Sequence, residues 1–290
     1  MTEKNEHVWH VRRHLKAREP LLVGTLFFTD GMRKPAFVSN GMHPDYGVHL
    51  LADQYVLAES IGETLNFPPN VRSVVVAPSP LSRAVQTARH NFIGMCRSYA
   101  RDILGIDTEN LGETDTVRLS TNGLHRYTKF HLLHGLTETP YRNSRDELDD
   151  GNELVALAYD KTFNPDFEGY RFMAQKGFEE DPRSEHPDNV VTRALRDVIP
   201  VLLGHDVVLS ASHQWNMEAI TAALTGNYGT NGNELFERAG GEYGMGHGFE
   251  LRVYEKGGVI HDAQLQRTTR DPYTLDAELP VDVDVLRKYL

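Results

Sequence analysis

The chain of 290 residues is 40% hydrophobic and 24% charged, the makeup of a globular protein with one large or two small domains. Its formal net charge of −11, with no basic block, argues against nucleic acid as a partner, and its single cysteine, Cys96, excludes an internal disulfide. No run of about 18 apolar residues and no signal-peptide core occur, so we expect no membrane partner and a cytoplasmic location.

Two apolar runs in the first part of the chain are separated by a helical pattern. Residues 8–11 predict a strand that ends at the polar residues Arg13 and His14. Residues 72–77 predict a second strand, and the apolar side chains of residues 50–65 recur at intervals of three and four, which predicts a helix between the strands. Strands that alternate with helices indicate βα units and a mostly parallel sheet.

The segment after the second strand raises a question of charge. Ser79 suits a helix N-cap and Pro80 a first helical position, so a helix is predicted to begin there. Arg83 then falls in the first turn, although the helix macrodipole favours an anion at that end. Arg83 is therefore either a solvated side chain or part of a site where the helix N-terminus and the guanidinium share an anion.

The clearest helical stripe lies in residues 191–202. Pro200 within it is expected to kink or shorten the helix, and Gly204 to end it. Residues 206–211 predict a buried strand that leads to His213.

Weaker patterns complete the predicted sheet. Residues 129–133 resemble a third strand, residues 217–224 a helix closed by Gly226, and residues 249–254 a last strand. No internal repeat or linker divides the chain. We therefore predict one domain over residues 1–290, a three-layer α/β/α fold with a mostly parallel central sheet and insertions that form a cap.

Three segments lack a clear apolar pattern. Residues 97–128 and 139–189 are polar and are predicted to be insertions that cap the site and select the substrate. Residues 255–290 are predicted to be a C-terminal tail. The acidic run at 145–150 argues against a polyanionic substrate.

Polar residues follow four of the predicted strands. Arg13 and His14 follow the first, Arg83 the second, Glu138 the third and His213 the fourth. Ligands of open parallel sheets bind beyond the carboxyl ends of the strands, where side chains far apart in the chain can meet. Each residue alone is a weak signal, but their recurrence at the same structural position predicts a composite active site.

These strand ends carry motifs of a known family. Residues 79–88, SPLSRAVQTA, resemble the SPLxRAxQTA signature of the histidine phosphatase superfamily, also called phosphoglycerate mutase-like. Residues 13–14 are similar to its Arg-His-Gly motif, and residues 207–213, VVLSASH, to its strand that ends in Ser-His-Gly. Residues 136–138, Leu-Thr-Glu, stand where the superfamily carries a Leu-x-Glu with the proton donor. The mutase branch, branch 1, fits better than the acid phosphatase branch. The acid phosphatase branch opens with RHGxRxP, and residues 16–20 match this motif only out of register.

The resemblance implies a phosphomonoesterase that acts on a small phosphorylated molecule. His14 would attack phosphorus and form a phosphohistidine, while Arg13, Arg83 and His213 bind the phosphate. Glu138 would protonate the leaving oxygen and then activate water. Neither a metal nor a cofactor is implied, because the arginines take the place that magnesium holds in kinases.

Two departures from the superfamily leave other functions open. Leu15 and Gln214 stand where it carries glycine after each histidine; Leu15 would narrow the site or shift its backbone, and Gln214 would place an amide at its rim. The alternatives are a mutase that returns the phosphoryl group to another oxygen, and a catalytically silent phospholigand-binding or scaffold protein. Other glutamates compete with the one at 138 as the acid, namely Glu113, Glu147 and Glu153. The oligomeric state stays open, a homodimer included.

Other chemistries lack their residues. A metal site from His125, His131 and His134 is disfavoured, because the strand expected there separates the side chains and no cysteine or aspartate completes the set. The chain has neither the G-x-S-x-G of serine hydrolases nor the G-x-x-x-x-G-K-[ST] of P-loop enzymes. The sequence therefore predicts a metal-independent phosphatase.

Overall fold

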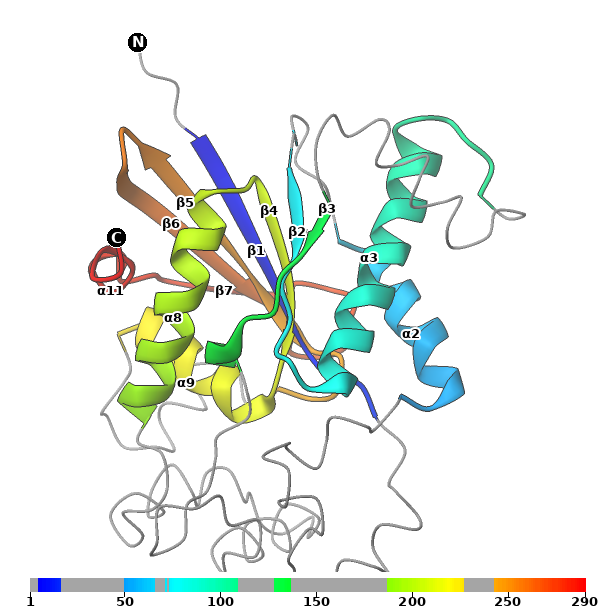
Figure 1. Cartoon of the computed structure of the whole chain (residues 1–290), viewed down its shortest axis with the longest axis horizontal. Helices are drawn as coiled ribbons and strands as arrows, with labels where there is room; N and C mark the ends of the chain where they lie inside the picture. The colour runs from blue at the N-terminus through cyan, green and yellow to red at the C-terminus, as the bar shows by residue number, and fades with distance from the viewer. Residues whose placement is uncertain are drawn as a thin grey trace, which may run out of the picture.

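The computed structural model describes residues 5–16, 50–65, 71, 73–108, 128–136, 187–226 and 243–290. Within these residues the strands are β1 (Asn5–Arg13), β2 (Val74–Val76), β3 (Thr128–Phe130), β4 (Val207–Ser212), β5 (Gly248–Lys256), β6 (Val259–Arg267) and β7 (Ala277–Leu279). The helices are α2 (Ala52–Glu63), α3 (Ser82–Asp102), α8 (Pro187–Leu203), α9 (Gln214–Leu224), α11 (Val283–Arg287) and the 3-10 turn η3 (His134–Leu136) (Figure 1).

The described strands form one sheet in the order β3-β2-β4-β1-β5-β6-β7. β3, β2, β4 and β1 pair in parallel, and β5, β6 and β7 continue the sheet from β1 by antiparallel pairing. The parallel core with its flanking helices confirms the predicted α/β fold. The antiparallel strands β5, β6 and β7 extend the sheet beyond the parallel core that was predicted. Most of their residues lie within 255–290, the segment predicted to be a tail.

A hairpin explains why these last residues are not a tail. Gly257 and Gly258 join β5 to β6, with φ of 64° and 81°. Two consecutive residues with positive φ form the tight turn that joins antiparallel strands, and glycine adopts it without steric cost. The Gly-Gly pair is therefore the sequence signal for the antiparallel half of the sheet.

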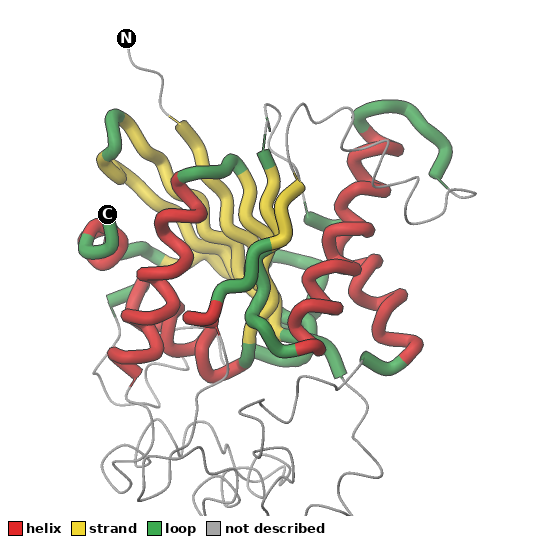
Figure 2. The backbone as a smooth tube through the Cα atoms, viewed as in Figure 1, coloured by secondary structure: helices red, strands yellow, loops and turns green. Residues whose placement is uncertain are grey.

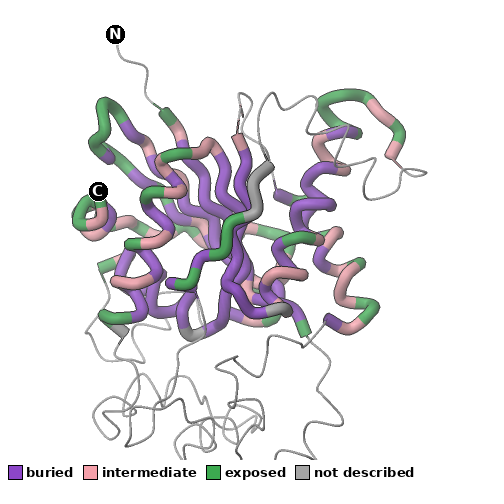
Figure 3. Tube along the Cα trace, in the orientation of Figure 1, coloured by how far each residue is buried: buried purple, intermediate pink, exposed green. Residues whose placement is uncertain are grey.

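Helices cover both faces of the sheet (Figures 1 and 2). α8, α9 and α11 share one buried hydrophobic cluster with Trp9 and Val11 of β1, whereas α3 packs in a second cluster with Val8. Successive side chains of a strand point to opposite faces, which is why neighbouring residues of β1 join different clusters. α2 packs against α3. Figure 3 shows that β4, between β2 and β1, is buried along its whole length.

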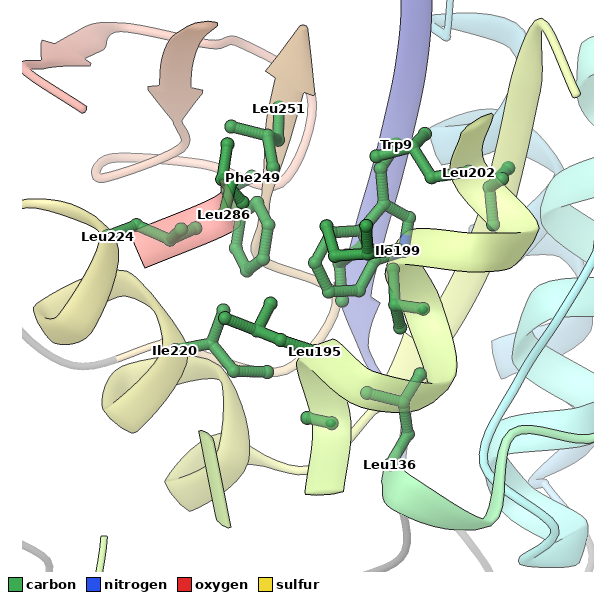
Figure 4. Packing of buried hydrophobic residues seen from close by; sticks show 14 of the residues in the cluster. Trp9, Leu136, Leu195, Ile199, Leu202, Ile220, Leu224, Phe249, Leu251 and Leu286 are labelled. Atoms are coloured by element: carbon green, nitrogen blue, oxygen red, sulfur yellow. The ribbon is translucent and has the colours of Figure 1, made fainter. Parts of the chain in front are cut away.

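Trp9 belongs to the larger cluster and is fully buried. Figure 4 shows its ring close to Ile199 of α8. The indole Nε1–H donates to Ser210 Oγ at 3.0 Å, and the ring meets Phe249 edge-on with centroids 5.3 Å apart. A buried tryptophan whose N–H is satisfied adds a large apolar area without a polar cost. It thus fixes β1 between β4 and β5, and so the strand that leads to His14.

α3 begins later than predicted. Its first residue is Ser82, so the assignments of Ser79 as N-cap and Pro80 as first helical residue are wrong. The backbone N–H of Ser79 instead donates to Ala211 O at 2.9 Å, which continues the β2–β4 pairing past the strand end. Arg83 still falls in the first turn of the helix.

α8 is an amphipathic helix that continues through its proline. Pro200 lies inside α8 on an exposed position, and the helix runs on to Leu203 before Gly204. The proline therefore does not shorten the helix, and the glycine ends it as predicted.

No helix in the described part of the chain has the length and apolar character needed to cross a membrane.

Candidate active site

The carboxyl ends of β1 and β4 bring two histidines together. Arg13 on β1 pairs with Ser212 on β4, so His14 and His213 leave neighbouring strands at the same level. The backbone N–H of His14 donates to Ser212 O at 2.9 Å, which carries the pairing one residue further. The two ring centroids lie 5.1 Å apart, and their planes are tilted by 55°.

The His14 ring carries its proton on a defined nitrogen. Nδ1 lies 2.9 Å from Leu15 O, and because a carbonyl can only accept, Nδ1 is the donor. In the neutral ring Nε2 then has the lone pair. Burial first, and then the charge of Arg83 and the proximity of His213, hold the pKa of His14 well below its usual 6.5. The ring is thus neutral near physiological pH, with Nε2 able to act as a nucleophile.

Arg13 is held by the segment that precedes β5. Its backbone N–H donates to His247 O at 2.7 Å, and its carbonyl accepts from Gly246 N at 3.2 Å. Its guanidinium donates through Nη1 to Tyr243 O at 2.6 Å. The buried Nε–H of Arg13 has no hydrogen-bond partner within the described part of the protein. Since buried donors are normally satisfied, this N–H is available to a ligand.

Thr87 connects the helix of Arg83 to the residue that follows His14. Its hydroxyl donates to Arg83 O at 2.8 Å and accepts from Leu15 N at 3.1 Å. Thr87 is fully buried, one turn after Arg83 in α3. The position of the first turn of α3 is therefore fixed relative to the residue that follows His14, and the Arg83 charge is near enough to act on the His14 pKa.

His213 is fixed by the turn between β2 and α3. Its Nε2 lies 3.0 Å from the hydroxyl of Ser79, and both residues are buried. Beside it, Ser212 Oγ donates to Leu136 O at 3.1 Å, and Asn216 Nδ2 donates to the same carbonyl at 2.9 Å. The strand end that carries His213 is thus tied to the β2–α3 turn and to η3.

The combined geometry is suited to an anion that reacts with an imidazole. Arg13 and Arg83 provide guanidinium groups, whose fork of N–H donors matches phosphate oxygens. His213 adds a third polar group beside the neutral His14 ring. In the part of the chain that the structure describes, no three histidine, cysteine, aspartate or glutamate side chains are grouped to hold a metal. The described residues therefore place two arginines and a second histidine near the neutral ring of His14.

No family model and no curated protein matches the chain, whereas solved structures do. A protein assigned as an alpha-ribazole-5′-P phosphatase from Escherichia coli is 13% identical, covers 94% of this chain and 100% of its own, and has a TM-score of 0.46. A phosphoglycerate mutase from Bacillus anthracis is 10% identical over 98% of this chain and 97% of its own, with a TM-score of 0.45. A mycobacterial glucosyl-3-phosphoglycerate phosphatase is 15% identical over 86% and 98%, with a TM-score of 0.41.

These matches are phosphatases and a phosphoglycerate mutase. Identities of 10% to 15% with TM-scores of 0.41 to 0.46 carry no argument about residues or substrate. The roles of the side chains therefore depend on the geometry of this chain.

Leu15 and Gln214, which replace the glycines of the superfamily, both turn into the protein. Leu15 is fully buried and packs with Leu50 and Ile61. Gln214 is 3% exposed, and its Nε2 donates to Glu218 Oε1 at 2.9 Å. The expectation that this amide stands at the rim of the site is therefore wrong.

The expected acid lies beyond what the structure describes. Glu138 is outside the described residues, as are its competitors, Glu113, Glu147 and Glu153. So are residues 109–127 and 139–186, which make up most of the two predicted insertions. Residues 97–102, assigned to the first insertion, instead form the last turns of α3.

Three supporting residues have no role in the sequence prediction. Thr87 belongs to the quoted SPLSRAVQTA motif, and its polar side chain inside an apolar helix stripe is a signal for a buried hydrogen bond. Tyr243 lies within GGEYGMGHG, residues 240–248, and its large aromatic ring is the signal for a buried contact in this glycine-rich segment. Glu218 follows Gln214 by one helical turn, a spacing that permits their hydrogen bond.

Proposed function

We propose that the chain is a phosphomonoesterase of the histidine phosphatase superfamily that hydrolyses a small phosphorylated molecule through a phosphohistidine at Nε2 of His14. The observation that carries the proposal is the His14 ring itself. It is buried, its Nδ1–H is bound to Leu15 O, and its pKa is lowered by burial and by the Arg83 charge. A neutral imidazole beside fixed cations is the nucleophile that an incoming phosphate dianion requires.

The first step forms a bond between His14 Nε2 and phosphorus and breaks the bond from phosphorus to the ester oxygen. Arg13, Arg83 and His213 bind the phosphoryl oxygens, which carry the negative charge in the transition state. Leu15 O accepts from Nδ1–H, so it stabilises the positive charge that the ring acquires. The leaving oxygen takes a proton, whose source we assign to Glu138.

The second step returns the enzyme to its starting state. Glu138, now ionised, takes a proton from water while the water oxygen attacks phosphorus. The bond between phosphorus and His14 Nε2 breaks, its electron pair returns to the ring, and inorganic phosphate is released. Protons and charges therefore balance over the two steps without any group beyond ester and water.

The test is phosphate release from an aryl phosphate and from a panel of phosphorylated metabolites. His14→Ala is expected to lower kcat by about 10⁴-fold or more, as loss of a catalytic nucleophile does. His261→Ala is the matched control, because His261 is an exposed histidine on β6. Rapid quenching with labelled substrate should trap phosphate on the wild-type chain in an acid-labile, base-stable form.

The same assays separate the alternatives. Exchange between isomeric phosphate esters with little net hydrolysis would identify a mutase. Phosphate binding with no turnover of any ester and no trapped phosphoprotein would contradict the enzyme proposal and leave a silent phospholigand-binding protein.

A further inference from the structure

A buried carboxylate lies in α9, one turn after the residue that follows His213. Glu218 is 3% exposed. Its Oε1 accepts two hydrogen bonds, from Gln214 Nε2 at 2.9 Å and from the backbone N–H of Tyr243 at 3.2 Å. Hydrogen bonds to an ionised carboxylate are charge-assisted and stronger than neutral ones, so these two donors are held firmly. Glu218 therefore joins the start of α9 to the segment that precedes β5.

Tyr243 carries this connection to Arg13. The backbone N–H of Tyr243 donates to Glu218, and the backbone carbonyl of the same residue accepts from Arg13 Nη1 at 2.6 Å. The rest of Tyr243 is fixed as well, since it is fully buried and its hydroxyl lies 2.8 Å from Thr221 Oγ1. The Arg267 guanidinium lies over its ring, 3.9 Å from the centroid. Tyr243 thus cannot move without a change in the direction of the Arg13 guanidinium.

The connection through Gln214 reaches the other side of the site. Gln214 is the first residue of α9 and directly follows His213. Its side chain is bound to Glu218, so the backbone that presents His213 is anchored to the same carboxylate that holds Tyr243. Arg13 and His213, the two groups proposed to bind the phosphate, are therefore linked to one buried oxygen.

We propose that Glu218 is a positioning residue, which holds Arg13 through Tyr243 and His213 through Gln214 so that both bind one phosphate group. This rests on the proposed function, because the phosphate is the ligand that the two groups share. Preorganised donors bind a transferring phosphoryl group without reorganisation, and misplacement of one donor weakens binding and catalysis together.

Three substitutions of Glu218 separate positioning from simple stability. In Glu218→Met the new side chain has a similar length but no oxygen to accept a hydrogen bond. In Glu218→Asp the charge is kept, but the shorter side chain no longer reaches the Tyr243 N–H. Glu218→Gln keeps an oxygen that can accept both hydrogen bonds. Thr221→Val is the matched control, since it removes the hydrogen bond to the Tyr243 hydroxyl from the same helix but leaves the Tyr243 backbone bound.

The experiment measures the Kd of inorganic phosphate by calorimetry and kcat/KM with an aryl phosphate, each in the wild-type and the Arg13→Ala background. Glu218→Met and Glu218→Asp are expected to weaken phosphate binding by about tenfold, the effect of one misplaced charge-assisted hydrogen bond. Glu218→Gln and Thr221→Val should stay within about twofold of wild type. In the Arg13→Ala background the loss should shrink to the part that acts through His213, because groups that act through one another are not additive. If the methionine variant does not fold, as judged by thermal unfolding, the aspartate variant provides the same comparison.

Unchanged phosphate affinity in the folded methionine or aspartate variant would overturn the positioning role, as would full additivity with Arg13→Ala. Either result, obtained with an active wild-type enzyme, leaves the proposed function intact. A wild-type chain that neither binds phosphate nor hydrolyses any ester would refute the proposed function itself and, with it, this role of Glu218.

Discussion

Replacement of Arg83 by glutamine tests how the site controls the charge of His14, the proposed nucleophile. After burial, the Arg83 charge is the largest cause of the lowered pKa of His14. Glutamine has a polar end but no charge, so the pKa of His14 should rise toward 6.5 in the variant. A protonated ring cannot attack phosphorus, and activity is lost as the pH falls through this pKa. The acid limb of the pH profile should therefore move to higher pH.

The loss of rate should be much larger than the change in protonation explains. Arg83 is also proposed to bind the transferring phosphoryl group, and removal of one such donor lowers kcat by about 10² to 10³-fold. Above the normal histidine pKa of about 6.5, the His14 ring is neutral in both proteins, so the loss in that range reports phosphate binding alone. Arg13, fixed by its hydrogen bond to Tyr243 O, should preserve the remaining activity.

Two measurements check these expectations independently. Nuclear magnetic resonance titration of labelled histidine in the ligand-free protein gives the His14 pKa, and kinetics from about pH 5 to 8 give the acid limb. Arg89→Gln is the matched control, because Arg89 is an exposed arginine on the same helix. A His14 pKa that is unchanged or lower in Arg83→Gln would refute the reasoning, as would an equal shift in Arg89→Gln.

Three further predictions concern the supporting contacts. Thr87→Val leaves the buried Leu15 N–H without its acceptor, so urea unfolding should show a loss of about 1–3 kcal/mol together with a fall in kcat/KM; unaltered stability would contradict it. Ser79→Ala removes the hydroxyl beside His213, and kcat/KM should fall about tenfold; an unaffected kcat/KM would show that the contact is dispensable. The pKa of His14 is lower in the folded than in the unfolded chain, so the unfolded state binds more protons below about pH 6.5. The free energy of unfolding should therefore decrease as the pH is lowered in that range. His14→Asn should flatten that decline, and an identical slope would exclude His14 as its source.

Local patterns were sufficient to predict the parallel core. The apolar runs at β1 and β4 and the stripe of α8 all reflect burial of one face or both, which sequence records directly. The ends of these apolar runs predicted where the strands end, and therefore that His14 and His213 lie close together. Side chains that follow parallel strands meet at the carboxyl edge of the sheet, so the order of strands and helices is enough to predict this meeting.

The errors arose where a distant partner decides the structure. Ser79 has the local character of a helix cap, yet its hydroxyl is bound to His213, 134 residues away. Gln214 was expected at the rim because it stands where the superfamily carries the glycine after the second histidine, but Glu218 satisfies its amide in the interior. In β6 the alternation of polar and apolar residues was visible, and the Gly257–Gly258 turn was the signal that was missed. The proposed role of Glu138 depends on the family resemblance alone.

The position of β1 in the sheet has a consequence for motion. β1 is hydrogen-bonded to β4 on one side and to β5 on the other, so its amides have partners on both edges. Such a strand opens with the whole domain rather than by local fraying, whereas β7, at the edge of the described sheet, can open alone. We therefore expect amide exchange in β1 to be among the slowest of the described strands and to match the free energy of global unfolding. The strand that leads to His14 then gives a native-state measure of how stably the site is assembled.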